Sequence, residues 1–265
     1  MPNENTVPPN LQGKHALVTG GATGIGFAIA QTLLQHGLRV TITGRTSRSL
    51  EDAVAQLSTH GEIQAVVMDV SAMSSVAQAF MQARSRFGEV DILINNAGQA
   101  SSAPFLKTTE EQWQNLLSVN LSGSFYCTQQ ALPAMVERGW GRIVNVASTA
   151  GLKGYAYVAA YCAAKHGVIG LTRALALEVA GKGVTVNAVC PGYTETDIVK
   201  QAISNIMQKT GRSEEQARAE LAASNPQKRL IQPQEVADAV LWLCQPSSQS
   251  QTGQSIAIAG GEVMS

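Results

Sequence analysis

Short apolar runs alternate with longer segments of helical periodicity along the whole chain, and this alternation limits the fold most strongly. Each run is short enough for a strand and apolar on both sides, as in strands buried on both faces of a sheet. The runs are HALVT (15–19), RVTIT (39–43), IQAVVM (63–68), DILIN (91–95), RIVNV (142–146), VTVNAV (184–189) and SIAIA (255–259). Repeated strand and helix units form a parallel sheet with helices on both sides, because their crossovers are right-handed. We therefore predict an α/β doubly wound sheet of about seven strands.

Helical spacing fills most of the intervals between these runs. The segments expected to be helical are 25–37, 47–60, 74–87, 110–137, 156–181 and 233–245. The 265 residues suit a single Rossmann-like domain, placed at 13–265, with a disordered tail at 1–12. Between 193 and 228 the strand pattern gives way to polar helix beyond a strand end, where such sheets bind ligands. We interpret 193–228 as a substrate lid.

Composition favours a small-molecule partner. Lys plus Arg and Asp plus Glu number 19 each, so no strong net field would attract nucleic acid or an anionic membrane. The N-terminal residues lack a signal-peptide layout and no apolar run is long enough to span a bilayer, so we expect a cytoplasmic protein. Cysteines and histidines show no metal-ligand spacing, and we predict neither a metal site nor disulfides.

A glycine-rich turn joins the first strand to the first helix. The run is Thr19-Gly20-Gly21-Ala22-Thr23-Gly24-Ile25-Gly26. A diphosphate must approach backbone N–H groups at a helix N-terminus, and a Cβ at Gly20 or Gly24 would obstruct it. Gly26 would let the helix pack on the sheet. The context of a strand before and a helix after favours a dinucleotide site.

The second strand ends in Gly44-Arg45-Thr46, where dinucleotide-binding units often place a carboxylate for the ribose of NAD. A guanidinium there can instead bind a 2′-phosphate in bidentate fashion. Arg45, helped by Thr46 and Thr23, therefore favours NADP(H). The competing interpretation is an exposed loop arginine.

The spacing GxxxGxG of TGGATGIG resembles the short-chain dehydrogenase/reductase family, and the resemblance continues along nearly the whole chain. The further matches, in order, are Asp69-Val70, Asn95-Asn96-Ala97-Gly98, Asn120, Ser148, Tyr161-Cys162-Ala163-Ala164-Lys165 and Pro191-Gly192. By this resemblance, Asp69 binds the adenine amino group and Val70 flanks the ring. Asp69 could equally be a turn residue before Ser71.

The same resemblance assigns the rest of the cofactor site. Asn96, Ala97 and Gly98 would lie under the adenosine ribose. Pro191 and Gly192 shape a turn, after which Thr194 and Thr196 would bind the nicotinamide carboxamide.

Tyr161 and Lys165 are four residues apart in a helical segment, so their side chains share a face. The ammonium of Lys165 would lower the pKa of Tyr161, which then acts as the acid/base group. Ser148 closes a strand and could bind the reacting oxygen. By resemblance, Lys165 also binds the nicotinamide ribose and Asn120 holds a water that links Lys165 to solvent. Taken singly, each residue also has a purely structural explanation.

Two branches of the family are similar in sequence: the acyl-carrier-protein or polyketide ketoreductases, and the 3-hydroxybutyrate dehydrogenases. The latter carry a histidine where this chain has Ala150, and fatty-acid reductases carry docking arginines at Pro133 and Leu177. Apolar side chains are expected to line the substrate pocket, namely Leu152, Tyr155, Tyr193, Ile198 and Met207.

We thus expect an NADP(H)-dependent ketoreductase acting on a hydrophobic ketone or 3-oxoacyl thioester. The alternatives are an NAD-dependent hydroxy-acid or alcohol dehydrogenase, and a non-catalytic NADP(H)-binding regulatory subunit. Relatives commonly form homotetramers through helices corresponding to 110–137 and 156–181, so a homotetramer, or a homodimer, is expected.

Overall fold

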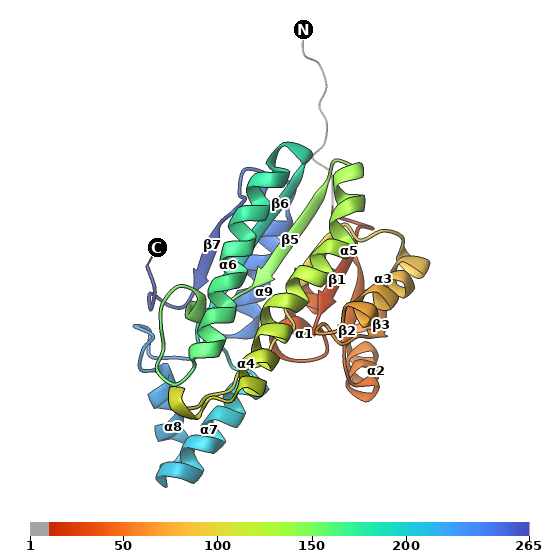
Figure 1. Ribbon diagram of the computed structural model, residues 1–265. Coiled ribbons are helices and arrows are strands. Elements are labelled where there is room, and N and C mark those ends of the chain that lie inside the picture. Colours follow the sequence, from red (N-terminus) through yellow and green to blue (C-terminus); the bar gives the residue numbers. More distant parts are fainter. Residues whose placement is uncertain (1–10, 265) are drawn as a thin grey trace.

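The computed structural model describes residues 11–264, and within them seven parallel strands form one sheet in the order β3-β2-β1-β4-β5-β6-β7 (Figure 1). The strands are β1 (His15–Thr19), β2 (Arg39–Gly44), β3 (Ile63–Val67), β4 (Ile92–Asn95), β5 (Gly141–Val146), β6 (Val184–Pro191) and β7 (Ser255–Ile258). Central strands are buried along their whole length, whereas the edge strand β3 alternates. The doubly wound fold and its seven strands are confirmed.

Helices cover both faces of the sheet. One face packs against α1 (Gly24–Gln35), α2 (Ser47–Leu57) and α9 (Pro233–Cys244). The other packs against α3 (Met73–Phe87), α5 (Gly123–Glu137) and α6 (Ala159–Val179), with α4 (Glu110–Leu117) preceding α5. Figure 1 shows α3, α5 and α6 in front of the sheet and α1 and α9 behind it.

The winding reverses between β1 and β4. Strand β1 pairs with β2 on one side and β4 on the other, so that Leu17 lies between Thr41 and Leu93. The connections leaving β1 and β4 run to opposite faces, which opens a crevice at the carboxyl ends of these two strands. The fold therefore places its ligand site beside the glycine-rich turn.

Several predicted helices differ from the observed ones, and the helix expected over 47–60 ends at Leu57. The helix expected over 110–137 contains a π-helical turn, Ser118–Ser122, between α4 and α5. The helix expected from 156 begins at Ala159, because Tyr157 has a left-handed backbone with φ of 67°.

Leu11 is buried in the core, so the ordered domain includes residue 11 rather than beginning at 13. The remainder of the predicted tail, residues 1–10, lies outside the described residues.

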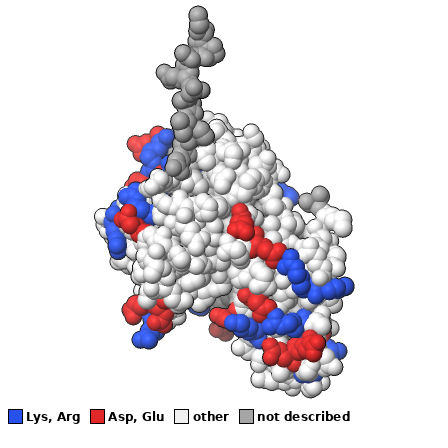
Figure 2. All heavy atoms as spheres, turned by 180° about the vertical axis from the view of Figure 1, so that it is seen from behind, with Lys and Arg blue, Asp and Glu red and all other residues white. Residues whose placement is uncertain are grey.

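The segment expected to be a lid contains two helices, α7 (Asp197–Thr210) and α8 (Glu214–Ala222), which we call the α7–α8 segment. It projects beyond the carboxyl ends of the strands (Figure 1). A small core of its own includes Val199 and Ile203 from α7 and Ala217 from α8. Figure 2 shows Lys and Arg beside Asp and Glu on this projection. Its ion pairs include Arg218 with Glu195 and Arg212 with Glu220.

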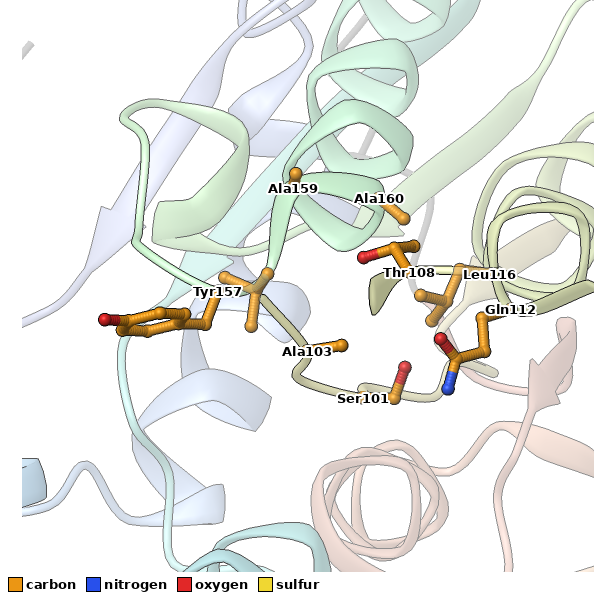
Figure 3. A pocket seen from close by; sticks show the side chains of 9 residues that line it. Ser101, Ala103, Thr108, Gln112, Leu116, Tyr157, Ala159 and Ala160 are labelled. Carbon is orange, nitrogen blue, oxygen red and sulfur yellow. The ribbon is translucent and has the colours of Figure 1, made fainter. Parts of the chain in front are cut away.

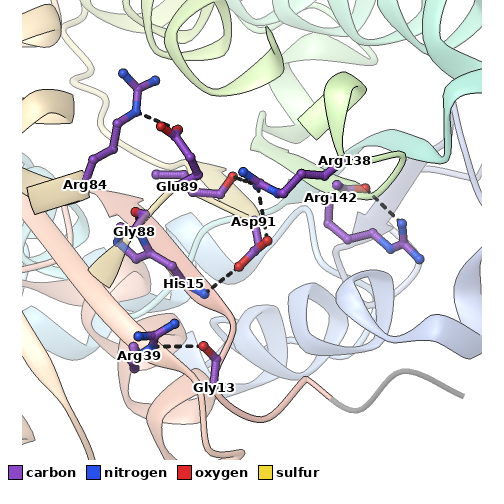
Figure 4. Close-up of polar contacts among 11 residues, drawn as sticks. Gly13, His15, Arg39, Arg84, Gly88, Glu89, Asp91, Arg138 and Arg142 are labelled. Atoms are coloured by element: carbon purple, nitrogen blue, oxygen red, sulfur yellow. Dashed lines mark hydrogen bonds and ion pairs between the residues drawn. The ribbon is translucent and has the colours of Figure 1, made fainter. Parts of the chain in front are cut away.

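A polar cluster ties the strands together at the opposite end of the sheet (Figure 4). The buried His15 ring lies 2.8 Å from both the Gly88 carbonyl oxygen and Thr41 Oγ1. The backbone N–H of His15 donates to Asp91 Oδ2 at 2.9 Å, and Arg138 pairs with Asp91 Oδ1 at 3.2 Å. Burial lowers the pKa of His15. This cluster fixes β1 against β2 and β4, away from the ligand crevice.

No helix within residues 11–264 is both long enough and apolar enough to cross a membrane.

Candidate active site

Hydrogen bonds join the turns that follow β1 and β4. Thr19 Oγ1 accepts from the backbone N–H groups of Asn96 and Ala97, both at 2.9 Å. In return, Asn96 Nδ2 donates to the carbonyls of Thr19 and Gly20 at 2.9 and 3.0 Å. Asn96 and Ala97, which were predicted to lie under a ribose, therefore fix the shape of the glycine-rich turn.

The glycines of this turn leave no room for side chains. A Cβ on Gly26 would lie 2.2 Å from the Gly20 carbonyl oxygen. Gly20 and Gly24 have φ of 63° and 55°, and a Cβ on Gly24 would reach Thr196 Cγ2 at 3.1 Å.

The N-terminus of α1 opens directly onto the glycine turn. Its N-cap residue, Thr23, makes no side-chain capping bond, and Ile25, in the first turn of the helix, is only partly buried. The first N–H groups of α1 are therefore available to an anionic ligand. This cradle fits the diphosphate of a dinucleotide.

The end of β2 supplies a second helix N-terminus. Arg45 and Thr46 are exposed, and α2 begins at Ser47 without a side-chain cap from Thr46. The Arg45 guanidinium makes no ion pair within residues 11–264, although its charge helps to lower the pKa of the Asp69 carboxyl. Arg45 and the uncapped N-terminus can therefore act on one bound anion.

Asp69 is already engaged in the turn after β3. Its Oδ1 accepts from Ser71 N at 2.9 Å and from Ser71 Oγ at 2.7 Å, and these bonds hold the pKa of Asp69 low. The turn role that was the alternative for this residue is therefore present. Val70 is buried, and a Cβ on Gly123 would lie 2.9 Å from its side chain, so Val70 packs on the start of α5.

Tyr161 and Ser148 meet at the carboxyl end of β5. Ser148 follows this strand, and Tyr161 lies in the first turn of α6. The two hydroxyls form a hydrogen bond. Burial raises the pKa of Tyr161, and the bond with Ser148 opposes only part of that rise. The expected lowering of this pKa by Lys165 is therefore wrong, since desolvation of the phenol dominates.

Lys165 lies one helical turn beyond Tyr161 and is buried. Its ammonium donates to the Val146 carbonyl oxygen at 2.9 Å and lies 5.7 Å from the centre of the Tyr161 ring. Burial lowers the pKa of Lys165 to about 8. A charge in this position costs desolvation energy, which indicates a functional rather than a packing role.

Asn120 occupies the π-helical turn. Its Nδ2 donates to the Leu116 and Gln99 carbonyls, both at 2.9 Å, and its Oδ1 accepts from Gln99 N at 3.2 Å. In an α-helix the Leu116 carbonyl would accept from the backbone of residue 120, so the side chain replaces a helical bond. A Cβ on Gly98 would lie 2.8 Å from Asn120 Oδ1 and 3.6 Å from Lys165 Nζ. Gly98 thus sits between Asn120 and Lys165.

The turn after β6 closes the other side of the crevice. Pro191 ends the strand, and Gly192 N donates to the Ile258 carbonyl at 3.0 Å. Thr194 is buried, and its hydroxyl donates to the Gly192 carbonyl at 3.0 Å. Thr194 therefore stabilises the turn in this structure, whereas Thr196 at the N-terminus of α7 lies over Gly24.

The predicted substrate residues divide into two groups. Tyr155 and Tyr193 form an edge-to-face pair with centroids 6.5 Å apart, and Leu152 packs on a small core under Ser148. Ile198 is exposed, and Met207 instead lines a 240 Å³ hollow between α7 and α8. The structure brings the first three residues near Ser148 and leaves the other two on the α7–α8 segment.

A much smaller hollow lies beside the start of α6 (Figure 3). It measures about 10 Å³, enough for about one water molecule. Its lining includes Gln112, Leu116 and Ala160, while the Tyr157 ring points away from it. None of the lining residues belongs to the predicted site.

Among residues 11–264, no group of three His, Cys, Asp or Glu side chains could hold a metal ion.

Sequence reasoning missed two features. Buried amides connect the strands below the site: Asn95 Nδ2 donates to Asn145 Oδ1, and Asn145 Nδ2 donates to Thr172 on α6, at 2.9 and 2.8 Å. Glu262, near the C-terminus, accepts a bond from Tyr155. Asn95 stood within a recognised motif, but no local pattern identifies Glu262.

The geometry defines a dinucleotide-dependent oxidoreductase: a phosphate cradle at the switch point lies next to a tyrosine, serine and lysine set. The family model described as short chain dehydrogenase matches residues 14–206. The D-beta-hydroxybutyrate dehydrogenase of Rhizobium meliloti (strain 1021) is 39% identical over 94% of this chain and 98% of its own. The acetoacetyl-CoA reductase of Cupriavidus necator is 40% identical over 93% of this chain and 96% of its own.

A solved structure shows the same likeness. An actinorhodin polyketide ketoreductase variant with NADPH superposes with a TM-score of 0.91 at 38% identity, covering 94% of this chain and 97% of its own. The chain belongs to the short-chain dehydrogenase family. It is an enzyme that interconverts C=O and CH–OH groups with a nicotinamide dinucleotide.

Proposed function

We propose that this enzyme is an NADPH-dependent ketoreductase for hydrophobic ketones or 3-oxoacyl thioesters. The observation that carries the proposal is the meeting of Ser148, Tyr161 and Lys165 beside the glycine cradle. Relatives named as ketoreductases and acyl reductases support the direction of the reaction. The intact catalytic set argues against a non-catalytic regulatory subunit.

The choice of NADP(H) over NAD(H) depends on Arg45. A 2′-phosphate at the end of β2 would meet this guanidinium, the Thr46 hydroxyl and the N-terminus of α2. A carboxylate at the same place would repel it. The related polyketide ketoreductase was solved with NADPH, which supports this assignment.

The remaining cofactor contacts follow from the crevice. The diphosphate would lie on the turn of Gly20, Gly24 and Gly26, near Thr23 and Ile25. Asp69 would bind the adenine amino group and Val70 would flank the ring, while Asn96, Ala97 and Gly98 would lie under the adenosine ribose. Lys165 would bind the nicotinamide ribose, and Thr196, with the turn of Pro191, Gly192 and Thr194, would hold the carboxamide.

When bound, the nicotinamide supplies a hydride to the carbonyl carbon. The Ser148 and Tyr161 hydroxyls then hold the carbonyl oxygen, and Tyr161 donates a proton to it as negative charge develops. The raised pKa of Tyr161 keeps this phenol protonated at neutral pH. Lys165 and Asn120, which lie on either side of Gly98, provide the route for reprotonation.

The substrate side is formed by Leu152, Tyr155 and Tyr193, and we assign the α7–α8 segment as a lid over it. Tyr193 is 40% exposed and lies four residues before the start of α7, so its ring is accessible to an apolar ligand. The helices α5 and α6 expose Phe125 and Leu177, which fits assembly as a homotetramer or homodimer.

A panel of ketones assayed with NADPH tests the proposal. We expect turnover of cyclic ketones and of neutral 3-oxo esters or thioesters, followed by loss of NADPH absorbance. Turnover restricted to small charged substrates, or supported equally by NADH, would contradict it.

A further inference from the structure

A buried carboxylate lies on the substrate side of the site. The Glu262 side chain is only 2% exposed, although it lies near the C-terminus. Its Oε1 accepts a hydrogen bond from the Tyr155 hydroxyl at 2.6 Å and pairs with Lys153 Nζ at 3.1 Å. Burial alone would raise the pKa of Glu262, but bonds from Tyr155, Lys153 and Ser224 outweigh it and lower this pKa. Glu262 is therefore a fixed negative charge at neutral pH.

Tyr155 connects this charge to the reacting groups. The Tyr155 oxygen in turn accepts a hydrogen bond from Thr149 Oγ1 at 2.8 Å, because its own proton is donated to Glu262, and Thr149 directly follows Ser148. The Tyr155 ring packs edge-to-face on Tyr193, whose own environment includes the charge of Glu262. Glu262 thus lies next to Tyr155 and Tyr193, the two tyrosines that form one side of the proposed substrate site.

The carboxylate also lies behind the turn after β6. A Cβ on Gly192 would come within 3.2 Å of Glu262 Oε2. Gly192 belongs to the turn assigned to the nicotinamide, so one carboxylate lies behind both the cofactor side and the substrate side. Gly260 packs against Asn225 at the base of the α7–α8 segment, which holds the C-terminal segment in place.

The positive charge of Lys153 is already paired with the carboxylate of Glu262. Within residues 11–264, Lys153 is the cation that contacts Tyr155 and Glu262, and its ammonium lies 4.9 Å from the centre of the Tyr155 ring. An incoming substrate carboxylate would find Lys153 paired with Glu262, and Glu262 held by its bonds to Tyr155 and Lys153. The ion pair offsets part of the charge of Glu262, but the Lys153 side chain is 38% exposed and screened by solvent, whereas the carboxylate is buried, so a net negative field remains to repel a second carboxylate.

We propose that Glu262 is a selectivity residue that excludes free 3-oxo acids and leaves the site to neutral carbonyl compounds such as esters, thioesters and ketones. This inference rests on the proposed ketone reduction. By this proposal, the negative charge of Glu262 distinguishes the enzyme from a dehydrogenase that acts on free hydroxy acids. Glu262 acts through its field and through Tyr155, without touching the reacting atoms.

Acetoacetate and ethyl acetoacetate, assayed with NADPH, form a matched acid and ester pair. The wild type should prefer the ester by about a hundredfold in kcat/KM. Glu262→Gln should reduce that preference by about tenfold, through a lower KM for acetoacetate with kcat for the ester little changed. Lys153→Met should increase the preference, because it leaves the carboxylate without its partner. Equal preferences in all three proteins, or a shift in the same direction in both variants, would overturn the inference.

Binding provides a readout that needs no turnover. Calorimetric titration of the NADP⁺-loaded protein with 3-hydroxybutyrate should give a Kd about tenfold lower for Glu262→Gln than for the wild type, and an unchanged Kd for ethyl 3-hydroxybutyrate. Glu89→Gln, which removes the partner of Arg84 at the far end of the sheet, is the matched control and should behave as the wild type. If the wild type reduces no ketone, the proposed function fails, and the binding ratio alone then supports or overturns the role of Glu262.

Discussion

The ammonium of Lys165 lies 5.7 Å from the centre of the Tyr161 ring, and its hydrogen bond goes to the Val146 carbonyl rather than to the phenol. The lysine therefore lies beside the tyrosine ring without a bond to its hydroxyl, while Ser148 makes the direct contact. Burial keeps Tyr161 protonated, which suits a proton donor in reduction.

Tyr161→Phe should remove the proton donor and keep the ring. We expect turnover to fall by about 10²–10⁴-fold, with NADPH affinity unchanged within about twofold. Loss of NADPH absorbance measures the first quantity and fluorescence titration the second. Tyr157→Phe, at an exposed position, is the control. Substantial activity in Tyr161→Phe would mean that another group supplies the proton.

Lys165→Met should make the protein without cofactor more stable and less active. The pKa of Lys165 falls to about 8 because its ammonium is desolvated, and an apolar side chain of similar length avoids that cost. We expect a gain of about 1–3 kcal/mol in the free energy of unfolding, reduced by loss of the bond to Val146. Urea denaturation measures it. A destabilised variant would show that the lysine is held mainly by packing.

Arg45→Ala should weaken NADPH binding by about tenfold to a hundredfold and leave NADH binding nearly unchanged. The guanidinium has no ion-pair partner among residues 11–264 and is free to bind a phosphate. Arg48→Ala tests the specificity of the effect, since Arg48 lies in the first turn of α2 and pairs with Asp52 at 3.3 Å. Equal losses for both cofactors would exclude the 2′-phosphate role.

The free energy of unfolding should decrease as the pH falls, because His15 has a lowered pKa in the folded protein. Its pKa is lowered in the folded state, mainly by burial, so below the unfolded value of about 6.5 the unfolded chain binds the proton more readily. The folded state then loses at most about 1.4 kcal/mol per pH unit until the folded pKa is reached. Unfolding free energies at about pH 7.5 and about pH 5.5 should differ less in His15→Gln than in the wild type. The same pH dependence in both proteins would assign the effect elsewhere.

Assembly should depend on α6. Leu177 is 83% exposed on this helix, and a charge there would be buried without a partner in any interface through α6. Leu177→Glu should sediment as a smaller species than the wild type. Met81→Glu on α3, also at an exposed apolar position, should not. A wild type that sediments as a monomer would refute the expected assembly.

The sheet could be predicted because its strands are buried on both faces, which makes each of them a continuous apolar run. Residue types and their spacing in the sequence likewise identified the glycine-rich turn and the pair of Tyr161 and Lys165. The direction of the Tyr161 pKa shift could not be predicted, since it depends on how completely the folded protein excludes water from the phenol.

Glu262 was missed for a related reason. It is 107 residues from Tyr155 in the chain, and the contact arises because the end of the chain returns to the loop after β5. The π-helical turn was missed because the helical pattern continues through it. Its stabilising bonds come from the Asn120 side chain and from Gln99, a residue outside the helix.

The π-helical turn Ser118–Ser122 limits which single-residue deletions the chain can accept. Each residue of a regular helix rotates the next by about 100°. Deleting one residue from 118–122 would allow continuous α-helical bonding and satisfy the Leu116 carbonyl from the backbone, yet it would rotate Asn120 away from Gly98 or shift all of α5 on the sheet. Natural homologues with this site should therefore tolerate substitutions around Asn120 far more readily than single-residue deletions, even where the deletion makes a better helix.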